Sequence, residues 1–280
     1  MEATITASEI TSAKGSRQLV MVTATDEPSA RLADRAGVDI ILVGDSLAMT
    51  ALGRPNTLTI TLDEMIHHTR AAVTGARRAL LVADMPFGSY QTSVADAVRS
   101  ACRLVAEGGA HAVKLEGPRH DEVAAIVAAG VPVMGHLGLT PQSLHRLGGY
   151  RVQGREIDQA YSLIEQARSL ERAGAFLLVL EAIPPALAAA ITRAIVIPTI
   201  GIGAGPECDG QVLVFADVLG LSDQPLARFV RRYADLAGTI RAALEEFAAD
   251  VRERRYPAQV ECYPDPPGLA EALAKHLERE

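Results

Sequence analysis

The stretch "AHAVKLEG", residues 110–117, joins a buried strand to two charges. Ala112, Val113 and Leu115 are apolar, whereas Lys114 and Glu116 stand two residues apart and so share one face of a strand. Burying a charge is costly unless the charge is paired or binds a metal. The stretch therefore predicts a strand that is apolar along its length and carries chemistry at its carboxyl end.

Similar apolar runs recur along the chain. Each is almost continuously hydrophobic, as expected of strands that are covered on both faces. Ala-, Arg- and Glu-rich segments with helical spacing separate them, for example residues 93–110 and 157–175. With 111–117, the runs are 18–26, 39–46, 79–87, 131–138, 176–182, 197–205 and 211–221.

Alternating strands and helices indicate a parallel sheet, and eight such units favour a closed α/β barrel, the (β/α)8 or TIM barrel. A doubly wound open sheet is the alternative fold. The eighth unit is the weakest, because residues 211–221 also fit a junction between a strand and a helix.

Composition narrows the class of protein. The chain has 280 residues, of which 49% are hydrophobic and 4% aromatic, so aliphatic side chains must build the core. A net charge of −7 without a basic run argues against nucleic acid as a partner. No apolar stretch is long enough to span a membrane, and the polar N-terminal segment lacks a signal-peptide core. Three cysteines without metal or disulfide spacing complete the expectation of a cytoplasmic protein.

Polar residues follow the predicted strands at their carboxyl ends, which is the active-site face of such barrels. Asp45, Asp84 and Glu116 come from three consecutive strands, and three hard carboxylates suit Mg²⁺. His136 lies one strand further and stands alone. The alternative for any one of these acids is a helix cap.

Two further charges have two interpretations each. Lys114 either binds an anionic substrate oxygen or balances the acids in a salt bridge. Glu181, which ends an apolar run, acts either as a general base or as a metal ligand or cap. A metal at this face would chelate a 2-oxo acid and stabilise the enolate formed when a base removes the proton next to the carbonyl.

Seven motifs of the sequence, in order, resemble those of the ketopantoate hydroxymethyltransferases, from about residue 15 to about residue 263. That family consists of Mg²⁺-dependent (β/α)8 barrels of the phosphoenolpyruvate/pyruvate superfamily. The motifs are "VGDSLAMT" (43–50), "ADMPFGSY" (83–90), "GAHAVKLEG" (109–117), "GHLGLTPQS" (135–143), "GGYRVQGR" (148–155), "LLVLEAIP" (177–184) and "IPTIGIGAGPECDGQ" (197–211).

By matching motif, the resemblance implies that Asp45 and Asp84 are metal ligands close to the keto acid, with Glu116 completing the acidic set. Ser46 and Lys114 are implied to bind substrate together with these acids.

The resemblance also implies that Glu181 accepts the C3 proton of 3-methyl-2-oxobutanoate. The enolate then attacks the one-carbon unit of 5,10-methylenetetrahydrofolate, which gives 2-dehydropantoate for pantothenate biosynthesis. It further implies a homo-oligomer, a homodecamer, with the 2-oxo acid and the folate as its small-molecule partners.

Four places depart from the family pattern: Thr25 replaces a tyrosine, Ala48 a glycine, and Cys262 a histidine, while residues 53–57 lack the usual aspartate. We expect Thr25 to enlarge the substrate pocket. Two other functions therefore stay open, a paralogue that acts on another 2-oxo acid in specialised metabolism and a non-catalytic oligomeric barrel.

The expected domain organisation is a catalytic barrel over residues 1–263 and a C-terminal extension over 264–280. The extension opens with the Pro-rich break "PDPPG". Residues 269–280 then predict a short helix, with Leu269, Leu273 and Leu277 on one stripe that packs on a neighbouring subunit or forms a frayed end.

Overall fold

The computed structural model describes residues 3–222 and 226–279 and contains a closed barrel of eight parallel strands in sequential order. The predicted (β/α)8 barrel is confirmed, and all eight apolar runs contain a strand. The strands are β1 (Leu19–Thr23), β2 (Ile40–Val43), β3 (Leu80–Asp84), β4 (Ala112–Glu116), β5 (Val133–Gly138), β6 (Leu177–Glu181), β7 (Thr199–Ile202) and β8 (Gly210–Leu213).

Pairing of β1 with β8 closes the barrel and rules out the open sheet, with Leu19 opposite Gly210 and Met21 opposite Val212. A Cβ atom at position 210 would lie 2.4 Å from the Leu19 carbonyl oxygen, so this close approach requires glycine. The ambiguous eighth run contains both predicted elements, because β8 is followed at once by helix α10 (Phe215–Leu219).

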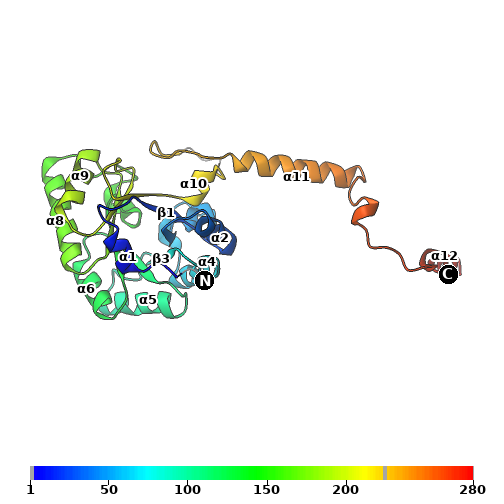
Figure 1. The fold of residues 1–280 in the computed structure, drawn as a ribbon, viewed down its shortest axis with the longest axis horizontal. Coiled ribbons are helices and arrows are strands. Elements are labelled where there is room, and N and C mark those ends of the chain that lie inside the picture. The colour runs from blue at the N-terminus through cyan, green and yellow to red at the C-terminus, as the bar shows by residue number, and fades with distance from the viewer. Residues whose placement is uncertain (1–2, 223–225, 280) are drawn as a thin grey trace. The chain divides into compact units, whose positions relative to one another are not determined.

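Helices cover the outside of the barrel (Figure 1). Local signals fix where they begin: Thr61 and Glu64 form a reciprocal capping box at the start of α4, and Ser93 caps α5. The long helices are α2 (Glu27–Arg35), α4 (Leu62–Gly75), α5 (Val94–Ala106), α6 (His120–Ala128), α8 (Ile157–Arg172) and α9 (Pro185–Ala194). The short ones are α1 (Ala7–Ser12), α3 (Leu47–Thr50), η1 (Thr57–Thr59), η2 (Pro141–Ser143) and α7 (Leu144–Leu147).

Side-chain alternation along the strands separates two apolar layers. In β4, Val113 and Leu115 pack in the layer between strands and helices, whereas Ala112 belongs to the cluster inside the barrel. Lys114 and Glu116 share the inward face and line a pocket at the carboxyl end. The two charges of the stretch 110–117 are therefore buried, and both face the pocket.

The two ends of the barrel differ. Ile10 of α1 is fully buried in the inner cluster together with Leu19 and Leu80, which begin their strands, so α1 covers the amino-terminal end. The pocket that Lys114 and Glu116 line is at the opposite end of the barrel.

Contacts divide the chain into two compact units, Met1–Ala234 and Asp235–Glu280. The second unit contains α11 (Leu236–Arg252), η3 (Gln259–Glu261) and α12 (Leu269–Leu277). The helix expected after the Pro-rich break is present. The barrel-containing unit ends earlier than residue 263, and the expected domain boundary stays a prediction. Among the described residues, no helix is both long and apolar enough to cross a membrane.

Candidate active site

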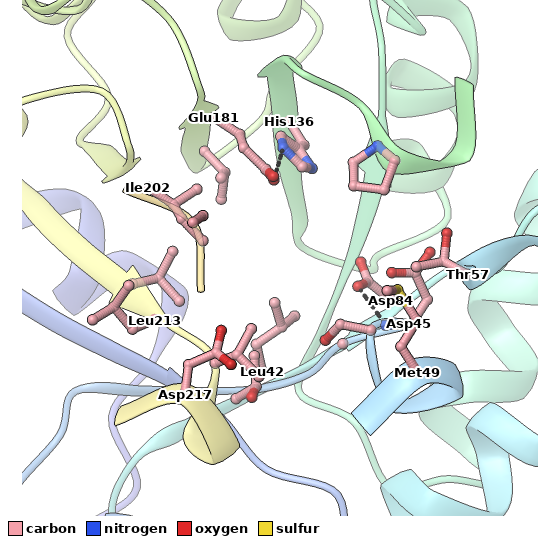
Figure 2. Close-up of a pocket in the computed structure, with 18 of the residues that line it drawn as sticks. Leu42, Asp45, Met49, Thr57, Asp84, His136, Glu181, Ile202, Leu213 and Asp217 are labelled. Carbon is pink, nitrogen blue, oxygen red and sulfur yellow. Dashed lines mark hydrogen bonds and ion pairs between the residues drawn. The ribbon is translucent and has the colours of Figure 1, made fainter. Parts of the chain in front are cut away.

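Polar side chains from five successive strands and their loops meet in one pocket of about 490 Å³ at the carboxyl end of the barrel (Figure 2). All the site residues that the sequence predicted line it. They are Asp45, Ser46, Asp84, Lys114, Glu116 and Glu181.

Asp84 lies at the centre of the acidic side of the pocket. One of its oxygens, Oδ2, accepts the backbone N–H of Asp45 at 2.9 Å, and the other, Oδ1, pairs with Lys114 Nζ at 2.6 Å. The side chains of Asp84 and Lys114 are 3% and 4% exposed, so this is a buried ion pair. Strand register explains it, because Asp84 of β3 pairs directly with Lys114 of β4.

Burial and the neighbouring charge of Asp84 raise the pKa of Asp45 to about 7, against an opposing effect of Lys114. Burial disfavours the charged form of Lys114, but Asp84, Glu116 and Asp45 outweigh it and raise the pKa of the ammonium group. Lys114 therefore stays positively charged, and it is surrounded by carboxylates that repel one another.

The ammonium group of Lys114 also lies 3.3 Å from His136 Nδ1. An ammonium has three N–H donors and no acceptor, so His136 accepts at Nδ1 and carries its proton on Nε2. That nitrogen faces the Glu181 carboxylate, with Oε2 at 3.1 Å. Burial and the charge of Lys114 lower the pKa of His136, which favours this neutral form. His136 does not stand alone, as the sequence suggested, but links Lys114 to Glu181.

Two backbone features place Glu181 beside His136. Gly138, which pairs with Glu181 across β5 and β6, has φ 92°, and a Cβ there would lie 2.2 Å from the Glu181 carbonyl oxygen. Ala182 has φ 46°, which is uncommon for a residue with a side chain. Hydrogen bonds from Ala182 N–H to Ile202 O and from Gln153 N–H to Ala182 O, both 2.9 Å, hold that turn.

The carboxylate of Glu116 contacts Gln142 and His136. Its Oε2 accepts the backbone N–H of Gln142 at 2.9 Å, and its Oε1 lies 3.6 Å from His136 Nδ1. Burial raises the pKa of Glu116 well above its usual range, and Lys114 opposes this.

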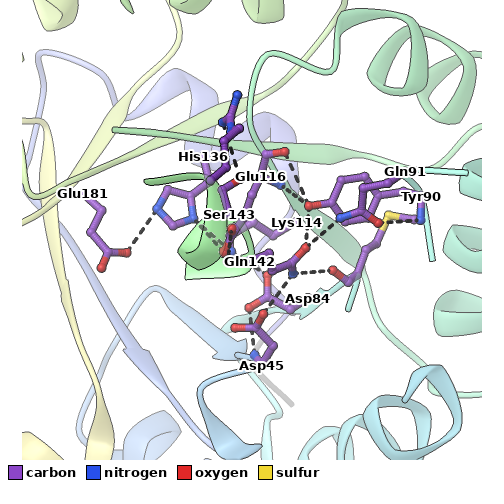
Figure 3. A network of polar contacts seen from close by, with 12 residues as sticks. Asp45, Asp84, Tyr90, Gln91, Lys114, Glu116, His136, Gln142, Ser143 and Glu181 are labelled. Carbon is purple, nitrogen blue, oxygen red and sulfur yellow. Dashed lines mark hydrogen bonds and ion pairs between the residues drawn. The ribbon is translucent and has the colours of Figure 1, made fainter. Parts of the chain in front are cut away.

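Gln142, in η2, is a site residue that sequence reasoning missed (Figure 3). Its Nε2 donates to Asp45 Oδ2 and to the Met85 carbonyl, both at 2.9 Å. Its Oε1 accepts from the Tyr90 hydroxyl at 2.6 Å and from Gln91 Nε2 at 3.1 Å. The amide is neutral and sits in a loop, so the only available signal was its place in the motif "GHLGLTPQS".

We expect Gln142→Leu to destabilise the protein, because it removes the buried partner of the Asp45 carboxylate and of the Met85 carbonyl and takes from the Tyr90 hydroxyl its shortest hydrogen bond. Each buried group left unsatisfied costs about 1–3 kcal/mol. Urea unfolding measures the loss, and a cycle with Tyr90→Phe should give a coupling of about 0.5–3 kcal/mol. Gln159→Leu, at an exposed position of α8, is the matched control. Equal stability of the two leucine variants would contradict the prediction.

Thr25, one of the four departures from the family pattern, and its neighbour Asp26 are not among the residues that line the pocket. Asp26 is the N-cap of α2 and accepts from Ser29. β1 contributes Met21 and Thr23 to the pocket lining, and Thr25 is not part of it. The backbone N–H of Thr25 donates to Ser29 Oγ instead. The expectation that Thr25 enlarges the pocket is therefore not supported by its position.

The remaining departures from the family pattern lie at different places in the structure. Ala48 is fully buried in α3, and Arg54 pairs with Glu64. Cys262 is exposed in the second unit. Thr57 lines the pocket with a buried hydroxyl that has no hydrogen-bond partner in the part of the chain that the structure describes.

The acid pair suits a hard divalent cation. Asp45 and Asp84 are adjacent and buried, and burial together with the charge of Asp84 raises the pKa of Asp45. Within residues 3–222 and 226–279, no three His, Cys, Asp or Glu side chains form a complete ligand set. Mg²⁺ usually takes one or two carboxylates and fills its other positions with water and substrate oxygens, so two carboxylates are compatible with it. The predicted ligand role of Glu116 stays a prediction.

Comparison with known sequences gives a consistent result. The model of the family described as ketopantoate hydroxymethyltransferase matches residues 4–259. A 3-methyl-2-oxobutanoate hydroxymethyltransferase of Oleidesulfovibrio alaskensis is 56% identical over 256 residues, covering 91% of this chain and 89% of the relative. The enzyme of that name from Moorella thermoacetica is 57% identical over 244 residues, covering 86% and 91%. That from Syntrophobacter fumaroxidans is 50% identical over 279 residues, covering 99% and 98%.

Solved structures with low sequence identity share the fold. Phosphonopyruvate hydrolase in complex with oxalate and Mg²⁺ matches with a TM-score of 0.59 at 16% identity, over 98% of this chain and 97% of that one. 2,3-Dimethylmalate lyase, a member of the PEP mutase/isocitrate lyase superfamily, matches with a TM-score of 0.58 at 16% identity, over 99% and 100%.

Proposed function

This chain belongs to the ketopantoate hydroxymethyltransferase family, and on that basis we propose that it transfers a hydroxymethyl group from 5,10-methylenetetrahydrofolate to 3-methyl-2-oxobutanoate. The product is 2-dehydropantoate, a precursor for pantothenate biosynthesis. The observation that carries the proposal is the pairing of His136 with Glu181 directly beside the buried set of Asp45, Asp84 and Lys114 (Figure 3).

The buried set would hold the keto acid and its metal. We propose that Asp45 and Asp84 hold Mg²⁺, with Glu116 as the third acid that the family resemblance implies. When bound, the ion supplies positive charge to the carboxylate and keto oxygens of the substrate. Phosphonopyruvate hydrolase, which shares the fold, has been solved with oxalate and Mg²⁺.

The chain's own donors orient the keto acid. Lys114 uses one N–H for Asp84 and one for His136, which leaves its third for a substrate oxygen. Thr57 adds an unpaired hydroxyl to the wall, and Ser46 lies beside Asp45. The salt-bridge and substrate-binding roles of Lys114 are thus compatible.

Glu181 would remove the C3 proton. Its carboxylate takes the proton, and the electron pair of the C–H bond passes into the enolate. The enolate carbon then forms a C–C bond to the methylene carbon of the folate, and the two C–N bonds that join this carbon to N5 and N10 break. Water supplies the hydroxyl group, and its remaining proton and the proton taken by Glu181 go to the two nitrogens, so that tetrahydrofolate leaves. His136 keeps the Glu181 carboxylate directed by its Nε2–H.

Product formation tests this proposal. Purified protein is incubated with 3-methyl-2-oxobutanoate, 5,10-methylenetetrahydrofolate and Mg²⁺, and 2-dehydropantoate is measured by mass spectrometry. Chelation of the metal is the control, and turnover should be lost there and return with added Mg²⁺. Absence of product in the complete mixture would contradict the proposal.

We do not expect Thr25 to set the choice of keto acid, because it is not part of the pocket lining. Thr25→Tyr should therefore leave the ratio of kcat/KM for 3-methyl-2-oxobutanoate and 3-methyl-2-oxopentanoate within about twofold, which is ~0.4 kcal/mol. A larger change would revive the paralogue that acts on another 2-oxo acid. The intact acids, Lys114 and Glu181 argue against the non-catalytic barrel.

We also propose that the protein is a cytoplasmic homo-oligomer, a decamer by family resemblance. The leucine stripe of α12 supports a subunit contact, since Leu273 and Leu277 are 51% and 71% exposed. Sedimentation of the purified protein measures the subunit number, and a monomer would contradict this proposal.

A further inference from the structure

One carboxylate in the pocket has no part in the chemistry described above. Asp217 lies in the first turn of α10, directly after β8, and lines the same pocket as the keto acid site. Figure 2 shows its carboxylate directed into the opening, on a different side from both Glu181 and the pair Asp45 and Asp84.

Asp217 is partly desolvated without being paired. Among the residues that the structure describes, its carboxylate has no hydrogen bond or ion pair. Burial raises the pKa of Asp217, and the charge of Arg232 only partly opposes this. The Arg232 guanidinium donates to the Ser222 carbonyl at 3.0 Å instead. Asp217 is half-buried, and a partly desolvated carboxylate that faces a pocket can accept hydrogen bonds from a ligand that brings its own donors.

The surroundings of Asp217 limit what that ligand can be. The pocket that Asp217 lines also contains the aliphatic side chains of Leu42, Ile202 and Leu213 (Figure 2). A cavity of about 490 Å³ is in the range that encloses a drug-sized molecule, which is much larger than a five-carbon keto acid. A flat apolar group with a polar edge suits an aliphatic part of the wall that carries the Asp217 carboxylate.

The pterin ring of the proposed folate donor has these properties. One edge of the ring carries two neighbouring donors, N3–H and the 2-amino group, and a carboxylate offers two acceptor oxygens for them. The one-carbon unit bridges N5 of the ring and N10, on the side of the bicycle away from the 2-amino edge. A ring held at its 2-amino edge by Asp217 therefore directs N5 toward the rest of the pocket, where the keto acid is proposed to bind.

We propose that Asp217 is the anchor for the 2-amino edge of the pterin ring, accepting two hydrogen bonds from N3–H and the 2-amino group. This inference rests on the proposed function. It separates the pocket into a keto acid side formed by Asp45, Asp84 and Lys114 and a donor side formed by α10.

Asp217→Asn tests the inference, since the amide replaces one acceptor with a donor that faces the ring donors. A hydrogen bond to a charged group changes an affinity by a factor of about 10–150. The KM for the folate should therefore rise by at least about tenfold in this variant. Exchange of the keto acid C3 proton with deuterated water does not use the folate. The variant should therefore exchange this proton at the wild-type rate and lose activity only in the transfer from the folate. Asp158→Asn, an exposed acid in the first turn of α8, is the matched control for both assays.

A modified ligand provides a second measurement that does not depend on the variant's overall activity. Wild-type protein should bind tetrahydrofolate at least about tenfold more tightly than its 2-desamino analogue, as one lost charged hydrogen bond predicts. In Asp217→Ala this preference should fall to within about twofold. An unchanged preference in Asp217→Ala, or a normal donor KM in Asp217→Asn, would overturn the inference while wild-type turnover still supports the proposed function. Failure of the wild type to use the folate at all would instead contradict the proposed function.

Discussion

Glu181→Gln is expected to slow the exchange of the C3 proton of 3-methyl-2-oxobutanoate with deuterated water by about 10²–10⁴-fold, the usual effect of losing a general base. The amide keeps the size of the side chain, and its oxygen can still accept the Nε2–H of His136, so the pocket should stay intact. What the amide cannot do is take a proton. Loss of exchange without loss of structure would therefore report the base itself.

Exchange is followed by NMR in the presence of Mg²⁺ and without folate, which isolates proton removal from the transfer step. Glu165→Gln, on an exposed part of α8, is the matched control and should exchange at the wild-type rate. If Glu181→Gln also exchanges at that rate, Glu181 holds His136 in place and another group removes the proton.

Asp84→Ala should have two separate effects, loss of Mg²⁺ binding and loss of stability. The variant removes one of two adjacent carboxylates, and it leaves the buried Lys114 ammonium without its ion-pair partner. Breaking a buried pair in this way typically costs about 3–5 kcal/mol. The effect on stability should therefore be seen even in metal-free protein.

A second substitution separates these effects. Adding Lys114→Met to Asp84→Ala removes the unpaired charge, and we expect most of the lost unfolding free energy to return while Mg²⁺ binding remains absent. Urea unfolding in chelator and titration calorimetry with Mg²⁺ are the two measurements, and Asp121→Ala, at a 77% exposed acid, is the control. Wild-type Mg²⁺ affinity in Asp84→Ala would contradict the metal role, and unchanged stability would contradict the importance of the ion pair.

The sequence by itself determined the architecture and the edge on which the site lies. Continuous apolar runs between helical segments require a parallel sheet covered on both faces, and the carboxyl ends of parallel strands meet at one edge. For that reason Asp45, Asp84, Lys114, Glu116 and Glu181 were expected together, and all of them line one pocket.

The tertiary structure decided which of these groups face one another. Strand register places Asp84 opposite Lys114 and Glu116 opposite His136, and a one-residue slip would have turned either side chain to the other face. Gln142 reaches Asp45 from η2, and Asp217 reaches the pocket from α10. Both elements follow strands and have no periodicity that predicts where their side chains point. Partner choice in the site depends on contacts between residues as far apart as 45 and 142, and such contacts exist only once the barrel has closed.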